Sequence, residues 1–186
     1  MLRLSALALL VTVAGCANLP ISVPDTARLQ PGELGIGING DVASVNLAQW
    51  AFASPARIRN RPVDAARAAG AMEYVAGSLN TNPGWANISI LTKEQLLQGR
   101  VEVRQALGVA PGAPSQAVVD RLSATAEALQ RNDQTEALRD LGPPVFVASP
   151  PAILARLYDM PYLQMANVST MRAANELFGP GEQDWH

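Results

Sequence analysis

The sequence predicts an all-α domain of about six helices in irregular, partly orthogonal packing, preceded by an extended N-terminal segment. Three observations lead to this prediction. Apolar residues recur at spacings of three and four along most of the chain. Residues that cap helices precede these stretches. Glycine and proline residues then interrupt the pattern at the points where one helix should end and the next begin.

The first two helices are predicted at 41–53 and 62–79. Val45 and Phe52 share one face of the first, and Pro55 ends it. The second starts near Pro62, with Asn60 as its cap. Its surface consists largely of alanine and glycine, which let a neighbouring backbone approach closely, so we expect this helix to be central.

A capping box, Thr92-Lys93-Glu94-Gln95, predicts a third helix that ends at Gly108. A fourth covers 114–131, and a second capping pattern at 133–136 opens a short helix to about Leu141. Val145 to Val147 is predicted to be a short buried extended segment. Two last helices follow Ser149-Pro150-Pro151 and Asp159-Met160-Pro161, and Gly179-Pro180-Gly181 ends the series.

The chain begins with a positive segment, Met1-Leu2-Arg3, and an apolar stretch from Leu4 to Ala14. This stretch is typical of an export signal, since spanning a bilayer takes about 20 residues. It ends in Val13-Ala14-Gly15-Cys16, which resembles the lipobox of bacterial lipoproteins. The resemblance implies that signal peptidase II cuts before Cys16 and that its sulfur carries a diacylglyceryl group. The alternatives are an ordinary signal peptide with a chance cysteine, or a buried N-terminal helix.

Cys16 is the only cysteine, so the exported domain must be stable without an internal disulfide. By the same resemblance, Ala17 in place of aspartate favours the outer membrane, facing the periplasm. Several acyl chains, palmitate among them, would make a lasting anchor. We therefore expect four parts: a signal peptide at 1–15, a lipidated N-terminus and flexible tether at 16–32, a helical domain at 33–178 and a flexible tail at 179–186.

The composition argues against several classes of function. The formal net charge is −2, and removal of residues 1–15 takes away one arginine, so binding to nucleic acid is not expected. His186, the only histidine, lies at the end of the predicted tail, which disfavours a serine–histidine–aspartate triad or a histidine-rich metal site. Acylation of Cys16 would remove thiol catalysis. We expect no enzyme activity, no metal and no cofactor.

Some residues nevertheless deserve testing as candidate sites. Glu73 on the small-residue helix could act as a buried acid with Asp64 or Asp159, as in glycoside hydrolysis, although a solvated or arginine-paired side chain is the favoured interpretation. Two candidate contacts for a partner are an arginine-rich loop and an aromatic side chain in a polar loop. They comprise Arg57, Arg59, Arg61 and Trp85, for which a solvated loop and packing over a helix end are the alternatives.

The sequence therefore favours a lipid-anchored envelope protein with a non-catalytic docking or structural function. Its partners would be the membrane, through the lipid, and another envelope protein or cell-wall material. The alternative is a helical module that encloses a small apolar ligand, which requires an apolar pocket between helices.

Overall fold

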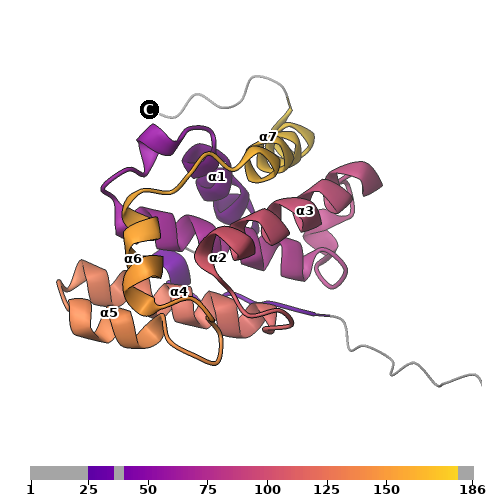
Figure 1. The fold of residues 1–186 in the computed structure, drawn as a ribbon. Helices are drawn as coiled ribbons and strands as arrows, with labels where there is room; N and C mark the ends of the chain where they lie inside the picture. The colour runs from indigo at the N-terminus through magenta and orange to yellow at the C-terminus, as the bar shows by residue number, and fades with distance from the viewer. Residues whose placement is uncertain (1–24, 36–39, 180–186) are drawn as a thin grey trace, which may run out of the picture.

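The computed structural model describes residues 25–35 and 40–179 (Figure 1). The predictions for the signal peptide, Cys16 and the tail from residue 180 lie outside these residues. The described residues confirm the all-α prediction, with seven α-helices and three short 3-10 helices. In chain order they are η1 (Glu33–Gly35), α1 (Gly40–Phe52), η2 (Pro55–Arg57), α2 (Pro62–Ser78), η3 (Pro83–Trp85), α3 (Ile90–Leu107), α4 (Ser115–Gln130), α5 (Gln134–Asp140), α6 (Pro150–Tyr158) and α7 (Gln164–Phe178).

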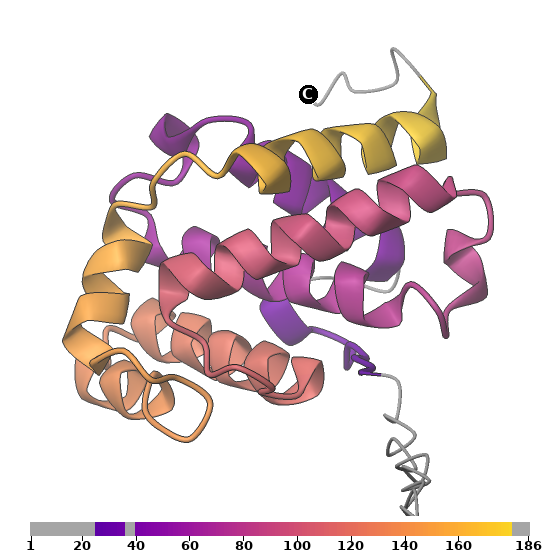
Figure 2. The same ribbon diagram turned by 45° about the vertical axis from the view of Figure 1, so that its right-hand side comes forward.

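Helix α2 forms the centre of the domain. It packs against α1, α3, α4 and α6, while α7 lies across α1 and α3 (Figures 1 and 2). Every residue from Ala68 to Leu79 is buried, on all sides of the helix. The central position predicted for this helix is therefore confirmed. A helix buried all round needs small or apolar residues on every face, which its sequence supplies.

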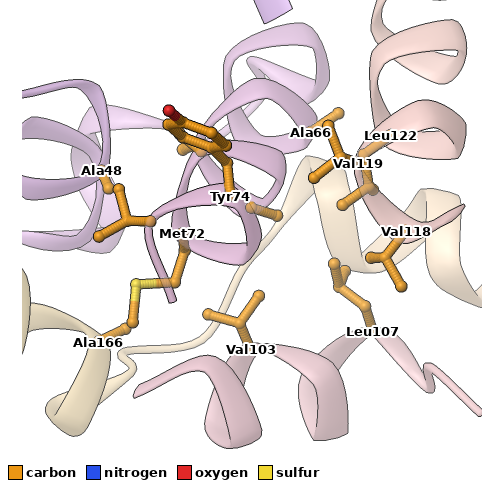
Figure 3. Packing of buried hydrophobic residues seen from close by; sticks show 14 of the residues in the cluster. Ala48, Ala66, Met72, Tyr74, Val103, Leu107, Val118, Val119, Leu122 and Ala166 are labelled. Atoms are coloured by element: carbon orange, nitrogen blue, oxygen red, sulfur yellow. The ribbon is translucent and has the colours of Figure 1, made fainter. Parts of the chain in front are cut away.

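Buried side chains of α2 pack against residues of the helices around it (Figure 3). Met72 points toward Ala48 of α1 and Ala166 of α7, whereas Ala66 lies beside Leu122 of α4. All five side chains are at most 1% exposed. One helix thus joins groups of helices that are distant in the sequence.

Two glycines of α2 mark its closest contacts. A β-carbon added at Gly70 would lie 2.6 Å from Cδ2 of Leu34, and one at Gly77 would lie 2.9 Å from Cβ of Ser115 and 3.1 Å from Cβ of Ala27. Real β-carbons essentially never come within 3.0 Å of another atom, so a side chain at either position would force its neighbour to move. The predicted close packing exists, and part of it involves the N-terminal segment.

Residues 25–35, called the arm below, pack on the helices. Ala27 and Leu34 are only 3% and 2% exposed. The amide of Ala27 donates to the carbonyl of Gly77 over 3.3 Å, and that of Leu34 donates to Oγ of Ser123 over 3.2 Å. The predicted flexible tether is therefore wrong for residues 25–32, and the packed domain includes the arm. Lack of a helical period does not prevent packing, because an extended segment can satisfy its backbone through neighbouring helices.

The start of α3 differs from the prediction. Ser89 is the N-cap, and its Oγ accepts a hydrogen bond from the amide of Thr92 over 3.2 Å. Thr92 is instead buried and donates to Glu176 of α7 over 2.7 Å. The second capping pattern is confirmed, because Asp133 accepts from the amide of Glu136 over 2.9 Å. Because Thr92 is hydrogen-bonded to Glu176, the N-cap of α3 is Ser89, about one turn before the predicted position.

The buried extended segment predicted at 145–147 is confirmed only at Phe146, which forms a single antiparallel bridge, because Val145 belongs to the preceding turn and Val147 is exposed. Phe146 pairs with Val109, the residue just beyond the left-handed Gly108 that ends α3. Val145 and Phe146 are buried, whereas Val147 is 71% exposed. The bridge fixes the chain between α5 and α6 against the end of α3.

Candidate functional site

The most polar buried region lies where α2, α3, α4 and the arm meet. Glu73 of α2 is only 1% exposed and carries a negative charge into the core. Arg104 of α3 holds it with both Nε and Nη2, and Nε lies 3.1 and 2.9 Å from the two carboxylate oxygens. A two-pronged pair of this kind is among the strongest charge-assisted hydrogen bonds. The sequence-favoured interpretation of Glu73 as an arginine-paired side chain is therefore confirmed.

Ser115 connects this pair to the arm. Its Oγ lies 2.6 Å from Oε1 of Glu73 and 2.6 Å from Oδ2 of Asp25, and its single proton can go to only one of them at a time. Its amide, at the start of α4, donates to Asp25 over 2.8 Å. Arg100 also donates to Asp25, over 2.9 Å. Two carboxylates and two guanidinium groups thus balance in charge within one cluster, which we call the arm cluster: Asp25, Glu73, Arg100, Arg104 and Ser115.

The protonation preferences follow from these contacts. Partial burial works to raise the pKa of Asp25, but hydrogen bonds from Ser115 and the charges of Arg100 and Arg104 outweigh it and lower that pKa. Burial disfavours the charged form of Arg104, yet its hydrogen bonds to Glu73 and the nearby carboxylates raise its pKa. Asp25 and Arg104 therefore both favour their charged forms, and the cluster ties the arm to three helices.

The arm cluster is poorly arranged for proton transfer. An acid or base needs access to a reacting group, but Glu73 is buried and both its oxygens are engaged by Arg104. The partners suggested from the sequence do not approach Glu73. Asp64 pairs with Arg61 over 2.6 Å, and Asp159 with Arg59 over 3.4 Å. The hypothesis of a carboxylate pair made of Glu73 and either aspartate is therefore wrong.

A cavity of about 350 Å³ lies beside the arm and the end of α2. The hydroxyl of Tyr74 donates to Asp41 and accepts from Nδ2 of Asn82 over 3.4 Å. Burial, followed by the hydrogen bond and charge of Asp41, raises the pKa of Tyr74 to about 12. The lining is mixed and largely polar: Thr26, Ala27, Arg28, Leu29, Tyr74, Ser78, Thr81, Asn82 and Pro83. It lacks the apolar walls that the small-ligand alternative requires.

A second cavity, of about 420 Å³, lies between the arm and α4 and has acidic walls. Burial raises the pKa of Glu33, and the charges of Asp120 and Glu127 raise it further. Within residues 25–35 and 40–179, no three histidine, cysteine or acidic residues gather closely enough to hold a metal ion. None of the helices in the same residues is long and apolar enough to span a membrane.

The loop with the three arginines is exposed and held in place at both ends. Arg57 donates a hydrogen bond to the carbonyl of Trp50 over 2.9 Å. Cζ of the Arg61 guanidinium group lies over the Trp50 ring, 5.2 Å from the ring centroid. The amide of Asn60 donates to the carbonyl of Tyr158 over 2.8 Å. Asn60 has a left-handed backbone and is not the N-cap of α2. No side chain forms a capping hydrogen bond at the start of this helix. The loop thus presents positive charge on an ordered backbone.

Trp85 is not available to a partner. It is only 1% exposed, and its indole Nε1 donates to Oγ of Ser78 over 2.7 Å. The prediction of Trp85 as a partner contact is therefore wrong. The hydrogen bond from Trp85 to Ser78 instead holds the loop after α2 against the end of that helix. A buried indole N–H needs such an acceptor.

The sequence analysis missed most of the arm cluster. Arg100 and Arg104 lie four residues apart on α3 and therefore share one face, which was the available indication for a charged contact with α2. Ser115 at a helix start gave a weaker indication. Asp25 gave none, because it lies in a proline-bearing segment without periodicity.

Comparisons with protein-family models, with curated proteins and with solved structures give no match to this chain.

Proposed function

We propose that this protein is a lipoprotein of the bacterial envelope, anchored through Cys16, that acts by docking and not by catalysis. One observation carries the proposal: a charged start, an apolar stretch and Val13-Ala14-Gly15-Cys16 occur in the order that export and lipidation require. The single cysteine of the chain stands at the position to be acylated. The residue after it, Ala17, favours the outer membrane on its periplasmic side.

The arm gives the proposed anchor a firm attachment to the domain. Asp25 follows Cys16 by nine residues, so a fully extended chain between them spans at most roughly 30 Å. A tether that ran to residue 32 would allow roughly 50 Å. A lipid at Cys16 would thus hold the domain close to the bilayer.

The arrangement of charges supports docking over catalysis. Glu73 is engaged with Arg104, while Asp64 and Asp159 pair with arginines near the surface. The ordered loop with Arg57, Arg59 and Arg61 is the surface proposed to contact an acidic partner, either an envelope protein or cell-wall material. Exposed ion pairs contribute little to stability, so these arginines can exchange partners at low cost.

Two experiments test the proposal. Mass spectrometry of the mature N-terminus should find an acylated Cys16, and Cys16→Ser should abolish acylation and leave uncleaved precursor or mislocalised protein. An unmodified N-terminus at another residue of the wild-type protein would contradict lipidation.

The docking surface is tested by charge reversal in the anchored protein. Arg57→Glu combined with Arg59→Glu should weaken co-purification of the envelope partner, whereas Arg139→Glu, another exposed arginine on α5, should not. An equal effect of both changes would argue against the arginine loop as the contact.

A further inference from the structure

The start of α3 exposes two consecutive apolar side chains. Ile90 is 81% exposed, the highest value among the large apolar residues of the described chain, and Leu91 is 61% exposed. Both belong to the first turn of a helix whose cap, Ser89, is fixed by Glu176. Single exposed apolar residues are common on proteins, but two adjacent ones on an ordered helix tip are a candidate contact with an apolar phase.

The loop that leads to this tip contains no charged residue. From Tyr74 to Thr92 the chain contains no charged residue. The exposed part of this stretch includes Asn80, Thr81, Pro83 and Asn87. Three carboxylates border this stretch. Glu176 accepts three hydrogen bonds from Ser89 and Thr92, Asp41 lies beside Gly84 and accepts from Tyr74, and the exposed Glu94 follows Leu91 by three residues in α3. Because moving charges out of water costs far more than moving amides or hydroxyls, an uncharged surface can approach lipid headgroups.

The arm passes beside the loop that precedes this tip. Thr26 and Leu29 line one cavity together with Thr81 and Pro83, which places the start of the arm beside the loop after α2. In both views the end of α2 and the start of α3 lie on the right-hand side, with the start of the arm below them (Figures 1 and 2). The arm therefore starts in the arm cluster, where Asp25 contacts Arg100 and the start of α4, and its next residues run beside the uncharged loop.

We propose that this end, formed by residues 79–91, lies against the bilayer that holds the lipid, with Ile90 and Leu91 in the interfacial layer. The inference rests on the proposed lipidation of Cys16. A lipid within roughly 30 Å of Asp25 keeps the bilayer at high effective concentration, so a weak contact suffices for occupancy. The arginine loop, which belongs to a different part of the fold, is then left open for a protein partner.

The test uses the mature lipidated protein in vesicles of phosphatidylethanolamine and phosphatidylglycerol. A fluorescent label sensitive to polarity is attached to Ile90→Cys or, as a matched control, to Val147→Cys. Val147 is 71% exposed and lies in the loop between α5 and α6, away from the start of α3 (Figure 1). Acylation of Cys16 leaves the introduced cysteine as the only free thiol.

We expect spin-labelled acyl chains to quench the label at position 90 at least about twofold more than that at 147, because an interfacial residue lies about 5–10 Å into the headgroup boundary. Circular dichroism checks that both labelled proteins are folded. If the labels at positions 90 and 147 are quenched equally in protein that floats with the vesicles, the contact of residues 79–91 with the bilayer is disproved, while the lipid anchor still stands. The uncharged end would then be available to a protein partner. Protein that fails to float would overturn the lipid anchor as well.

Discussion

Leu34 of the arm occupies the space that a side chain at Gly70 would need, since a β-carbon there would lie 2.6 Å from Cδ2 of Leu34. Gly70→Leu should therefore overpack this contact and lower the free energy of unfolding by about 1–3 kcal/mol. Gly77→Leu should act similarly through Ser115 and Ala27. Urea unfolding measures both changes.

The identity of the crowded neighbour can be checked with a double-mutant cycle. In a Leu34→Ala background, Gly70→Leu should cost at least about 0.5 kcal/mol less, because the two side chains then no longer compete for one space. Additive effects would show that Leu34 is not the limiting contact.

The buried pair of Glu73 and Arg104 gives a second prediction. Glu73→Gln should destabilise the domain by about 3 kcal/mol, because it breaks a buried ion pair. This value is near the lower end of the range for such pairs, since Asp25 remains close to both arginines and still compensates their charge. Asp64→Asn, which breaks the more exposed pair with Arg61, is the matched control and should cost less than about 1 kcal/mol. Similar urea midpoints for the two variants would contradict the burial assigned to Glu73.

The lowered pKa of Asp25 predicts a pH-dependent contribution to stability. Because the pKa is lower in the folded state than the ordinary value of 3.8, this contribution is present above that value and is lost as the pH falls through the folded pKa. The melting temperatures of the wild-type protein and Asp25→Asn should therefore differ at neutral pH and converge in acid. Other carboxylates titrate in both proteins and cancel in the comparison. A difference that stays constant would mean that the charge of Asp25 does not contribute.

Removal of the arm provides a fourth prediction. Deletion of Ile21 to Gln30 from protein expressed without residues 1–16 removes Asp25, Ala27 and the two hydrogen bonds between Arg28 and Gln116. At about 1 kcal/mol for each of at least two lost hydrogen bonds, the melting temperature should fall by roughly 4–8 °C. Arg28→Ala, which keeps these backbone bonds, should change it by at most about 2 °C. An unchanged melting temperature after the deletion would restore the tether interpretation.

Local features of the sequence determined most of the fold. The all-α class, the central position of the small-residue helix and the cap at Asp133 were predictable, because periodicity, composition and capping depend on residues within one or two turns. Pro55 and Gly108 likewise marked the ends of α1 and α3. For the proposed anchor, Cys16 and the residues before it are also a local pattern.

The tertiary structure decided which residues meet across long separations. Asp25 and Ser115 lie 90 residues apart, and Glu73 and Arg104 lie 31 apart. No local pattern joins them, since the contact exists only after α2, α3 and α4 have packed. The same reason explains the arm: its proline-bearing sequence lacks a helical period, yet the groove left by Gly70 and Gly77 on α2 provides its binding surface. Burial of Trp85 against Ser78 was decided in this way too, because the acceptor for its indole becomes available only when the loop folds back on the helix.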